Sequence, residues 1–301
     1  MAEFINFYLI PGIVLGSIYA LGAIGVTLTF GILRFANFAH GEIMTLGVYI
    51  TWSLIQLSGF NSMVHIFLLI MPVSMLLTIL AALLIDRGFY KPLRASHTII
   101  LVIASFGMML MVRSVTQFYW GVQLKTVLPG IQPRMTFFDF LNISAKHIWI
   151  ICGALVLMYA VHYLLTYTKI GKAMRAMSDS PELARLTGID TERVVLATWI
   201  IGTALAVAAG VFLAVDTQVE TMMGFNLLLP MFAAAILGGV GKPYGAMAGG
   251  LIIGIAEELS SYPWIGDQAL LSPGYKQGIA FAIMILMLLW RPTGLFRGRS
   301  F

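Results

Sequence analysis

Three polar side chains stand close together where the second apolar segment of this chain begins: Asn37, His40 and Glu42. An amide, an imidazole and a carboxylate at this spacing can hold a polar solute, and polar groups inside apolar segments normally face a bundle interior or a watery path. They therefore predict an inner gate or part of a translocation path. An equally good interpretation is a hydrogen-bonded boundary at which Glu42 faces lipid headgroups.

The histidines do not form a metal site. No two of them stand at metal-ligand spacing, and no Ser/His/Asp set can be nominated as a catalytic group. We expect no metal site and no catalytic residue, and most of the histidines are expected to be packing or interfacial residues: His40, His65, His97, His147 and His162.

The sequence also lacks a phosphate-binding loop. Gly241-Lys242 is followed by Pro243 rather than Ser or Thr, and Ile236 stands where the first Gly of such a loop is required. We therefore expect no cofactor on this chain, with ATP and magnesium held by other subunits if they take part.

Charged residues elsewhere in the apolar segments lie near segment ends. Arg113 is about two turns from the end of its segment, so its side chain is expected to reach the membrane surface as an anchor. Glu257 and Glu258 are expected to be solvated end charges, with pairing to Arg113 or Lys276, or contact with an external partner, as the alternatives.

Glycines crowd the stretch from Gly238 to Gly250, together with Ala246 and Ala248. Small residues allow helix backbones to approach closely in lipid. The stretch predicts tight helix packing, and as a second interpretation a backbone that lines the translocation path at Gly241 and Gly245. The break between its two apolar halves predicts a deep turn or a re-entrant bend.

Composition identifies the class of protein. The chain has 301 residues, of which 59% are apolar and only 10% charged, and its mean hydropathy is +0.92. Soluble proteins carry about 25% charged residues, so this is an integral membrane protein.

The net charge of +5 does not indicate a nucleic-acid-binding protein. The basic residues are scattered over short loops and form no continuous basic surface that could follow a phosphate backbone. The single Cys152 is expected to be a small buried hydrophobe.

The apolar runs predict an all-α, polytopic transmembrane bundle of about eight to nine spans, because about 20 apolar residues cross the hydrocarbon core. The first run follows no Lys or Arg and is expected to remain as a span rather than be cleaved. The candidate spans are 7–31, 37–57, 63–85, 97–119, 147–167, 195–215, 226–240, 245–261 and 276–290.

Basic residues in short loops set the orientation of such a bundle. One orientation puts thirteen of the 18 Lys and Arg residues inside and leaves outside only Lys125, Arg134, Lys146 and Lys276. It places the N-terminus outside and the C-terminus inside. We expect one transmembrane domain, residues 1–301, with an inward-facing elbow at 168–194; no stretch between spans is long enough for a soluble catalytic domain.

The elbow has the local signals of compact structure. Ser180 is a good N-cap, Pro181 suits a first helical position, and Gly188 can end a helix in the left-handed conformation. These signals predict a short helix over 181–187. The residues from 171 to 177 are expected to continue the preceding span as a helix, with the corner at Ser178 and Asp179.

The amino-acid sequence of the elbow resembles that of the coupling loop of permease subunits in bacterial ABC importers for branched-chain amino acids. The likeness runs from about residue 37 to 296, includes Asn-Phe-Ala-His-Gly at 37–41 and Gly-Gly-x-Gly-x-Pro-x-Gly-Ala at 238–246, and is greatest to the smaller of the two permeases. In the elbow it rests on Gly171, Arg175, Ala176, Asp179, Pro181, Ala184, Gly188 and Ile189.

This resemblance implies a multi-pass permease of the bacterial inner membrane, with no enzymatic activity of its own. It implies two ATP-binding cassette subunits docked on the elbows, a second related permease chain, and a periplasmic binding protein that delivers leucine, isoleucine or valine. Arg175, Asp179, Pro181, Ala184 and Gly188 would shape or contact the ATPase-docking surface, together with the other matched elbow positions.

Other functions fit the same sequence. Related permeases with these motifs handle urea or short amides. An ion-coupled amino-acid carrier would more plausibly show a carboxylate or a broken helix near mid-membrane, whereas the acidic groups here stand mainly at segment ends. A membrane-embedded hydrolase or transferase would show turnover as a purified single chain.

Overall fold

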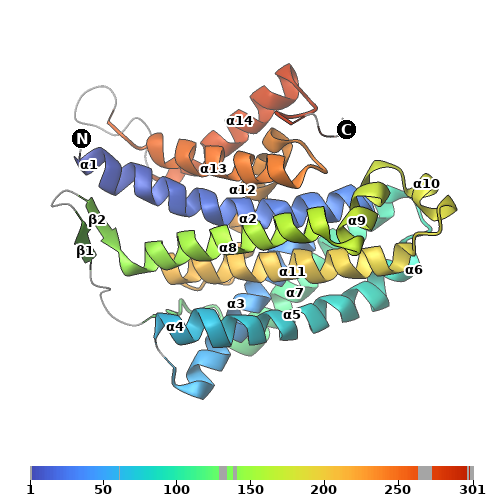
Figure 1. The fold of residues 1–301 in the computed structure, drawn as a ribbon. Helices are drawn as coiled ribbons and strands as arrows, with labels where there is room; N and C mark the ends of the chain where they lie inside the picture. The colour runs from blue at the N-terminus through green and yellow to red at the C-terminus, as the bar shows by residue number, and fades with distance from the viewer. Residues whose placement is uncertain are drawn as a thin grey trace.

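A computed structural model describes residues 2–60, 62–128, 134–137, 141–263, 273–296 and 298. Most of this part of the chain is helical, and the long helices lie side by side in one elongated bundle (Figure 1). Arg297 and Arg299, which the sequence places inside, lie outside the described residues.

The first half of the chain contributes seven helices. A π-helical turn joins α1 (Ala2–Phe4) to α2 (Ile10–Leu33), and similar turns join α4, α5 and α6 into one run. The remaining bounds are α3 (Ala39–Ser58), α4 (Met63–His65), α5 (Met71–Ile85), α6 (Lys91–Leu93) and α7 (Thr98–Trp120).

The second half begins with an antiparallel hairpin, β1 (Arg134–Phe137) and β2 (Leu141–Ser144), in which Met135 pairs with Ile143. Helices follow to the end of the chain: α8 (Ala145–Tyr167), α9 (Lys169–Asp179), α10 (Pro181–Leu186), α11 (Thr191–Asp216), α12 (Met223–Gly238), α13 (Pro243–Leu259) and α14 (Lys276–Trp290). Each apolar segment predicted from the sequence is helical in the structure.

Several of these helices are suited to cross a membrane. Among the described residues, five runs are long and apolar enough: Ile5–Leu33, Met63–Leu93, Thr98–Trp120, Ala145–Tyr167 and Thr191–Asp216. Two shorter apolar helices are Met223–Gly238 and Lys276–Trp290. The chain is therefore a multi-pass membrane protein.

Helices α2 and α11 form the centre of the bundle. Their most apolar windows are 78% and 72% buried, compared with 22% for α8. Helix α2 contacts α13, α11, α12 and α8, and it runs between α13 and α8 in Figure 1. The peripheral place of α8 explains why Cys152 is exposed; the prediction that this residue is buried was wrong.

Helices α2 and α13 approach each other through small residues. A methyl group added to Gly250 would lie 2.4 Å from Ala20 Cα, and one added to Gly254 would lie 2.2 Å from the Gly16 nitrogen. No side chain larger than hydrogen fits at these two positions unless the backbones separate. The close packing predicted from the glycine-rich stretch is thus present.

The break between α12 and α13 is a tight turn. Gly239 and Gly241 adopt φ values of +107° and +84°, which glycine accepts without strain. The segment after α14 covers this turn. Its backbone N–H groups at Leu295 and Phe296 donate to Leu237 O and Gly238 O at 2.8 and 3.1 Å, which satisfies carbonyls at the end of α12.

The N-terminal ends of α3 and α12 meet inside the bundle. A methyl group on Gly41 would lie 2.3 Å from Gly224 O, and the Gly224 N–H donates to Thr45 Oγ1 at 3.0 Å. The start of α3 also lies beside the second turn of α7, because Phe38 N–H donates to Ser105 Oγ at 3.3 Å. Helix α3 therefore begins well inside the bundle rather than level with α7.

Candidate functional site

A buried ion pair links α3 to α7. Arg113 Nε and Nη2 donate to Glu42 Oε1 at 3.0 and 2.5 Å, and the two side chains are only 14% and 1% exposed. The Arg113 guanidinium carbon also lies 4.8 Å from the centre of the Phe225 ring of α12, at cation–π distance. Glu42 Oε2 has no hydrogen-bond partner among the described residues.

This pair corrects two predictions. Arg113 does not extend to the membrane surface as an anchor, and Glu42 does not face headgroups. The physical reason is the position of α3, whose start lies inside the bundle, so that the first turn of α3 comes level with the middle of α7. Glu42 also lies in the first turn of its helix, where the helix dipole favours a negative charge.

Asn37 and His40 are buried as well, but they point elsewhere. Asn37 Oδ1 accepts hydrogen bonds from Tyr90 Oη at 3.2 Å and from the Ala39 N–H at 3.1 Å. The His40 ring packs on α2, where a methyl group added to Gly25 would lie 2.7 Å from it. Asn37, His40 and Glu42 thus face three different helices and do not converge on one cavity.

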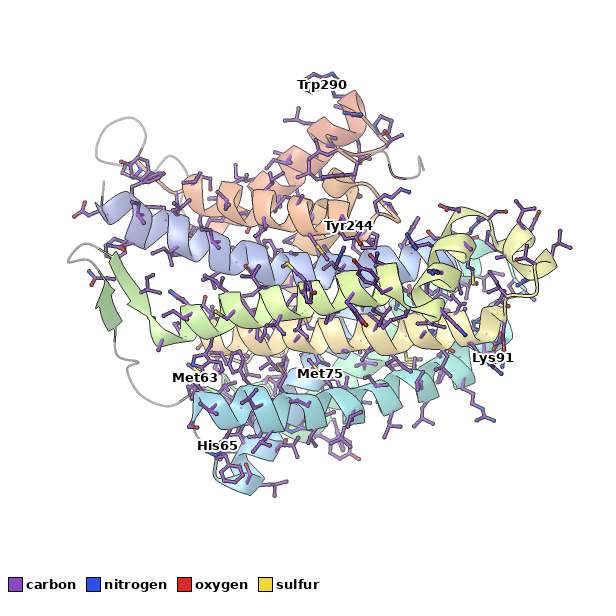
Figure 2. The ribbon with its side chains drawn as sticks, in the orientation of Figure 1. Met63, His65, Met75, Lys91, Tyr244 and Trp290 are labelled. Carbon is purple, nitrogen blue, oxygen red and sulfur yellow. The ribbon has the colours of Figure 1, made fainter. Side chains whose placement is uncertain are left out.

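The two glycines predicted for the translocation path also separate. Gly245 packs against the backbone of Gly238, where an added methyl group would lie 2.2 Å from the carbonyl oxygen. Gly241 instead lines a cavity of about 220 Å³ together with Arg175 and Asp179 of the elbow. Tyr244, which is labelled in Figure 2, borders the same cavity.

Glu257 and Glu258 take different partners. Glu258 forms an ion pair with Lys276 at 2.7 Å, as one of the two predicted alternatives requires. Glu257 is buried and accepts a hydrogen bond from Tyr19 Oη at 2.7 Å, so the expectation that both are solvated end charges was wrong. Their pairing with Arg113 was also wrong, because Arg113 binds Glu42.

The elbow consists of two separate helices. Thr168 is extended and its Oγ1 accepts a hydrogen bond from Gly171 N–H at 3.0 Å, so α9 is a new capped helix and not a continuation of α8. The predicted corner at Ser178 and Asp179 was also wrong, because α9 includes both residues and the chain turns at Ser180, with φ −150°.

The short second helix of the elbow was predicted correctly. Helix α10 spans Pro181–Leu186, and the Ser180 side chain accepts a hydrogen bond from Leu183 N–H. Gly188 ends it with φ +82°, and Ile189 N–H donates to Ala184 O at 3.0 Å. Local capping signals are sufficient to specify this helix because every partner lies within a few residues.

The residues predicted to dock an ATPase fall into two groups. Arg175, Ala176, Asp179 and Gly188 are exposed, and Pro181 is half-buried. Two others are buried, and they hold the elbow together from within. A methyl group added to Gly171 would lie 2.1 Å from Leu164 O of α8, and Ala184 faces the interior.

Two leucines of α10 form an exposed apolar surface that the sequence reasoning missed. Leu183 and Leu186 are 63% and 83% exposed. Their spacing of three residues puts them on one face of the helix, opposite Ala184. The signal was present in the sequence, because a capped helix in a polar segment has no reason to carry two large apolar residues on its outer face unless a partner covers them.

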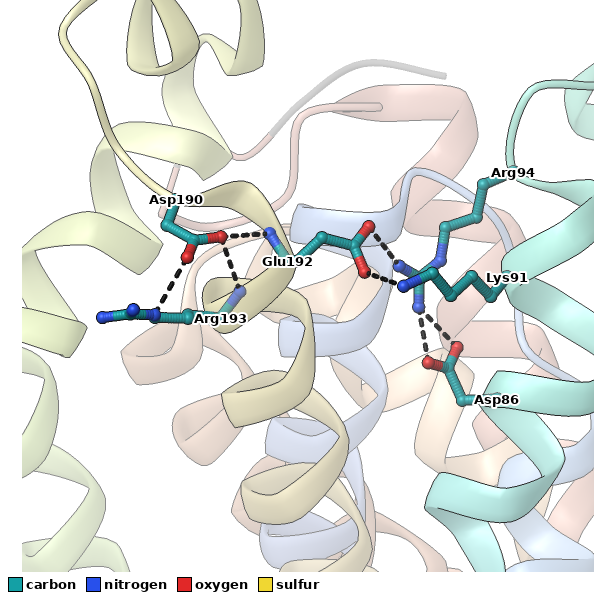
Figure 3. Close-up of polar contacts among 6 residues, drawn as sticks. All are labelled: Asp86, Lys91, Arg94, Asp190, Glu192 and Arg193. Carbon is teal, nitrogen blue, oxygen red and sulfur yellow. Dashed lines mark hydrogen bonds and ion pairs between the residues drawn. The ribbon is translucent and has the colours of Figure 1, made fainter.

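A charged network joins the end of the elbow to the run that contains α5 and α6 (Figure 3). Arg94 Nη2 donates to Asp86 Oδ1 at 2.6 Å, and Arg94 Nη1 donates to Glu192 Oε1 at 3.1 Å. Lys91 Nζ lies 2.8 Å from Glu192 Oε2, at the elbow end of the bundle (Figure 2). Glu192 stands in the first turn of α11, so the network connects the exit of the elbow to a second span.

Groups suited to hold a metal are not found among the described residues: no three His, Cys, Asp or Glu side chains gather there. The polar groups of this chain form pairs between helices. Such pairs can hold spans together, bind a polar solute or transmit a conformational change. They do not point to a catalysed reaction.

Comparison with known proteins identifies relatives of this chain. A family model described as "Branched-chain amino acid transport system / permease component" matches residues 8–288. The chain is 36% identical to the high-affinity branched-chain amino acid transport system permease protein LivH of Salmonella typhimurium, with 94% of this chain and 92% of that protein covered. It is 33% identical to the corresponding protein BraD of Pseudomonas aeruginosa, with 95% and 94% covered.

A solved structure has the same fold. PsaBC from Streptococcus pneumoniae, in complex with Fab, matches with a TM-score of 0.53 and covers 97% of this chain and 95% of that chain. Sequence identity is 14%, so the match concerns the fold alone. The match of the family model over nearly the whole chain, together with relatives above 30% identity, shows that this protein belongs to the family of branched-chain amino acid transport system permease components.

Proposed function

We propose that this chain forms the translocation path of an ATP-binding cassette importer for leucine, isoleucine and valine. The observation that carries the proposal is the family match across residues 8–288, on a chain whose structure combines membrane-spanning helices with a compact elbow. The chain itself is the permease component, and the energy for transport comes from partner subunits that bind ATP and magnesium.

The elbow, residues 168–194, is proposed to face the cytoplasm, which puts the N-terminus outside and the C-terminus inside a bacterial inner membrane. The distribution of Lys and Arg supports this orientation. The five long apolar runs together with α3, α12, α13 and α14 give a proposed count of nine spans. An odd count is what termini on opposite sides of the membrane require, whereas eight spans would leave both termini on one side. The whole of 1–301 then acts as one permease domain.

The elbow is proposed to dock an ATPase subunit through α10. Leu183 and Leu186 supply an exposed apolar surface, with Arg175, Ala176 and Asp179 beside it on the elbow. Gly171 and Ala184 support that surface from within. Helix α9 contacts α8, α11 and α2, so a push on the elbow reaches the central spans directly.

The remaining partners complete the proposed machine. A second, related permease chain lies beside this one, two ATPase subunits hold the two elbows, and a periplasmic binding protein delivers the amino acid. The names of the relatives support a branched-chain amino acid transport system. The second permease chain and the two ATPase subunits follow from the type of importer that the elbow resembles. Lipid surrounds the assembly, and nucleic acid is no part of it.

Asn37, His40, Glu42, Gly241 and Gly245 are proposed to border the translocation path at separate points along it, because they face different helices and no single cavity. Buried polar groups with unsatisfied atoms support this route: Asn37 Nδ2, His40 Nε2 and Glu42 Oε2 have no partners among the described residues. Such groups are costly inside a membrane protein, and each would gain a partner when helix movements during transport bring the solute to it.

Reconstitution tests the proposal. Vesicles that contain this chain, its partner permease, the ATPases and the binding protein are expected to accumulate leucine when ATP is supplied. Competition with valine, urea and a short amide then separates the amino-acid importer from an importer of urea or amides. Accumulation by vesicles that contain this chain alone, without nucleotide, would contradict the proposal and favour an ion-coupled carrier.

A further inference from the structure

A cavity of about 300 Å³ opens at the end of the bundle opposite the elbow. It lies where α11 ends and α12 begins, beside α2 and the start of α14. Glu220, Asn226 and Gln277 contribute polar groups to its wall. Of the residues that line the cavity in the described part of the chain, only Glu220 carries a charge.

Glu220 is held in a defined position. Asn226 Nδ2 donates to Glu220 Oε1 at 3.1 Å, and the Glu220 carbonyl accepts the Met223 N–H at 3.3 Å. The segment before it is anchored by backbone hydrogen bonds between Val219 and Lys125 at 2.7 and 3.0 Å. A fixed carboxylate without a lining cation gives the cavity a negative potential, which favours a positively charged ligand group.

One part of the wall suits an aliphatic group, whereas Tyr19, Thr217 and Gln218 add further polar groups elsewhere. Leu15, Leu213, Met223 and Leu227 line the cavity, and they offer only apolar side chains. Gln277 closes the polar side. Its Nε2 donates to Asn226 O at 3.5 Å, and a carboxamide nitrogen has a second N–H that can bind a carboxylate.

We propose that this cavity is the first binding site for the solute, and that it holds an α-amino acid with an aliphatic side chain. Glu220 binds the ammonium group, Gln277 donates to the carboxylate, and the leucines contact the side chain. The inference rests on the proposed function and adds the chemical basis of substrate choice. Urea and short amides carry no ammonium group, so Glu220 gives them no charge-assisted hydrogen bond.

Cysteine protection tests this site without relying on transport. The chain has one cysteine, Cys152, so Cys152→Ser gives a cysteine-free background on α8, far from the cavity in sequence and helix. Thr217→Cys then places one thiol in the cavity wall, and Gln218→Cys serves as a second position if the first variant does not assemble. Glu3→Cys, exposed outside the cavity, is the matched control.

The assembly is reconstituted with both permeases and the ATPases, and a membrane-impermeant maleimide is added from the side that the cavity faces. Leucine at about ten times its dissociation constant is expected to slow labelling of the cavity thiol about tenfold, because the unoccupied fraction of the site falls by about that factor. The amine 3-methylbutylamine is expected to protect, whereas 4-methylpentanoate, which lacks the ammonium group, is not. Glu220→Gln is expected to abolish protection by leucine, and Glu3→Cys is expected to label equally with and without it.

Absence of protection by leucine, or equal protection by 4-methylpentanoate, would overturn the site. The same vesicles, supplied with binding protein and ATP, test the proposed function separately. Leucine uptake without protection would remove this site and leave the proposed function standing. Protection without ATP-dependent leucine uptake would leave the site standing and contradict the proposed function.

Discussion

Arg113 Nε donates to Glu42 Oε1 at 3.0 Å, although the two residues lie 71 positions apart in the chain. Arg113 belongs to α7 and Glu42 to α3. The side chain of Glu42 is 1% exposed and that of Arg113 is 14% exposed, in a part of the bundle that the sequence assigns to the membrane. Ion pairs of this kind cost desolvation free energy, so their presence between transmembrane helices marks a position that holds the helices in one arrangement.

Removal of one member of this pair is expected to destabilise the protein. Glu42→Gln leaves the Arg113 guanidinium without its carboxylate, which costs about 3–5 kcal/mol for a buried pair. Thermal unfolding of the purified assembly in detergent measures the loss. The single variants Glu42→Leu and Arg113→Leu each leave one charge unpaired, and the double variant, which removes both charges, is expected to be more stable than either single variant. Additive losses in the double variant would show that the two side chains do not depend on each other.

The exposed leucines of α10 are expected to bind the ATPase. Leu186→Asp puts a charge on the centre of this apolar surface and is expected to reduce ATPase co-purification by about tenfold or more, because buried apolar contacts dominate such interfaces. Insertion of the chain in the membrane is expected to be normal. Leu57→Asp, at a similarly exposed leucine on α3, is the matched control. ATPase binding that is equal in the two variants would count against docking on this face.

Ala184→Glu is expected to uncouple ATP hydrolysis from uptake by a different mechanism. Ala184 is buried, so a larger charged side chain cannot be accommodated unless α10 moves away from its neighbours. Limited proteolysis is expected to cut the elbow of Ala184→Glu faster than that of Leu186→Asp, whose change is on the surface. Normal coupled transport by Ala184→Glu would contradict a role for the elbow in coupling.

Close packing of α2 and α13 predicts a sharp difference between two glycines. Gly250→Ala is expected to lower the free energy of unfolding by about 1–3 kcal/mol, as overpacking does, because the new methyl group would lie 2.4 Å from Ala20 Cα. Gly107→Ala in α7 is the control, since no atom lies within 4 Å of its added methyl group. Thermal unfolding of both variants tests this, and equal effects would show that α2 and α13 are not in backbone contact.

The network at the exit of the elbow predicts unequal effects of two carboxylates. The Asp86 side chain is 12% exposed and that of Glu192 is 57% exposed. Glu192→Gln is therefore expected to cost less than about 1 kcal/mol, as exposed ion pairs do. Asp86→Asn is expected to cost more, because it leaves Arg94 partly buried without its nearer carboxylate. Unfolding of both variants at low and high salt measures the difference, and a larger loss of unfolding free energy for Glu192→Gln than for Asp86→Asn at both salt concentrations would contradict it.

Structure that depends on neighbours along the chain was predictable from the sequence. The apolar spans and the helix α10 follow from residue type and from caps a few positions away, such as Ser180 and Gly188. The break at Thr168 was missed although Thr is a preferred N-cap residue. The hydrogen bond from Gly171 N–H to its Oγ1 shows that a second helix begins there.

Structure that depends on the relative depth of helices was not predictable. Arg113 was expected at the membrane surface because its distance was counted from the end of its own span. The position of α3, fixed by the contact of Gly41 with Gly224 and by Ser105, brings Glu42 to it instead. No pattern within either segment encodes this offset. The three polar residues of the candidate path, Asn37, His40 and Glu42, are buried. The directions in which the side chains of Asn37 and His40 point could be learned only from the structure.

The segment after α14 affects how this protein can be handled in the laboratory. Leu295 and Phe296 cap the carbonyls of Leu237 and Gly238, so these two residues act as part of the α12–α13 turn. An expression plasmid that trims the chain after Trp290, or that joins an affinity tag there, would remove this cap and expose the glycine turn. Purification tags are better attached beyond Gly298, where the cap remains intact.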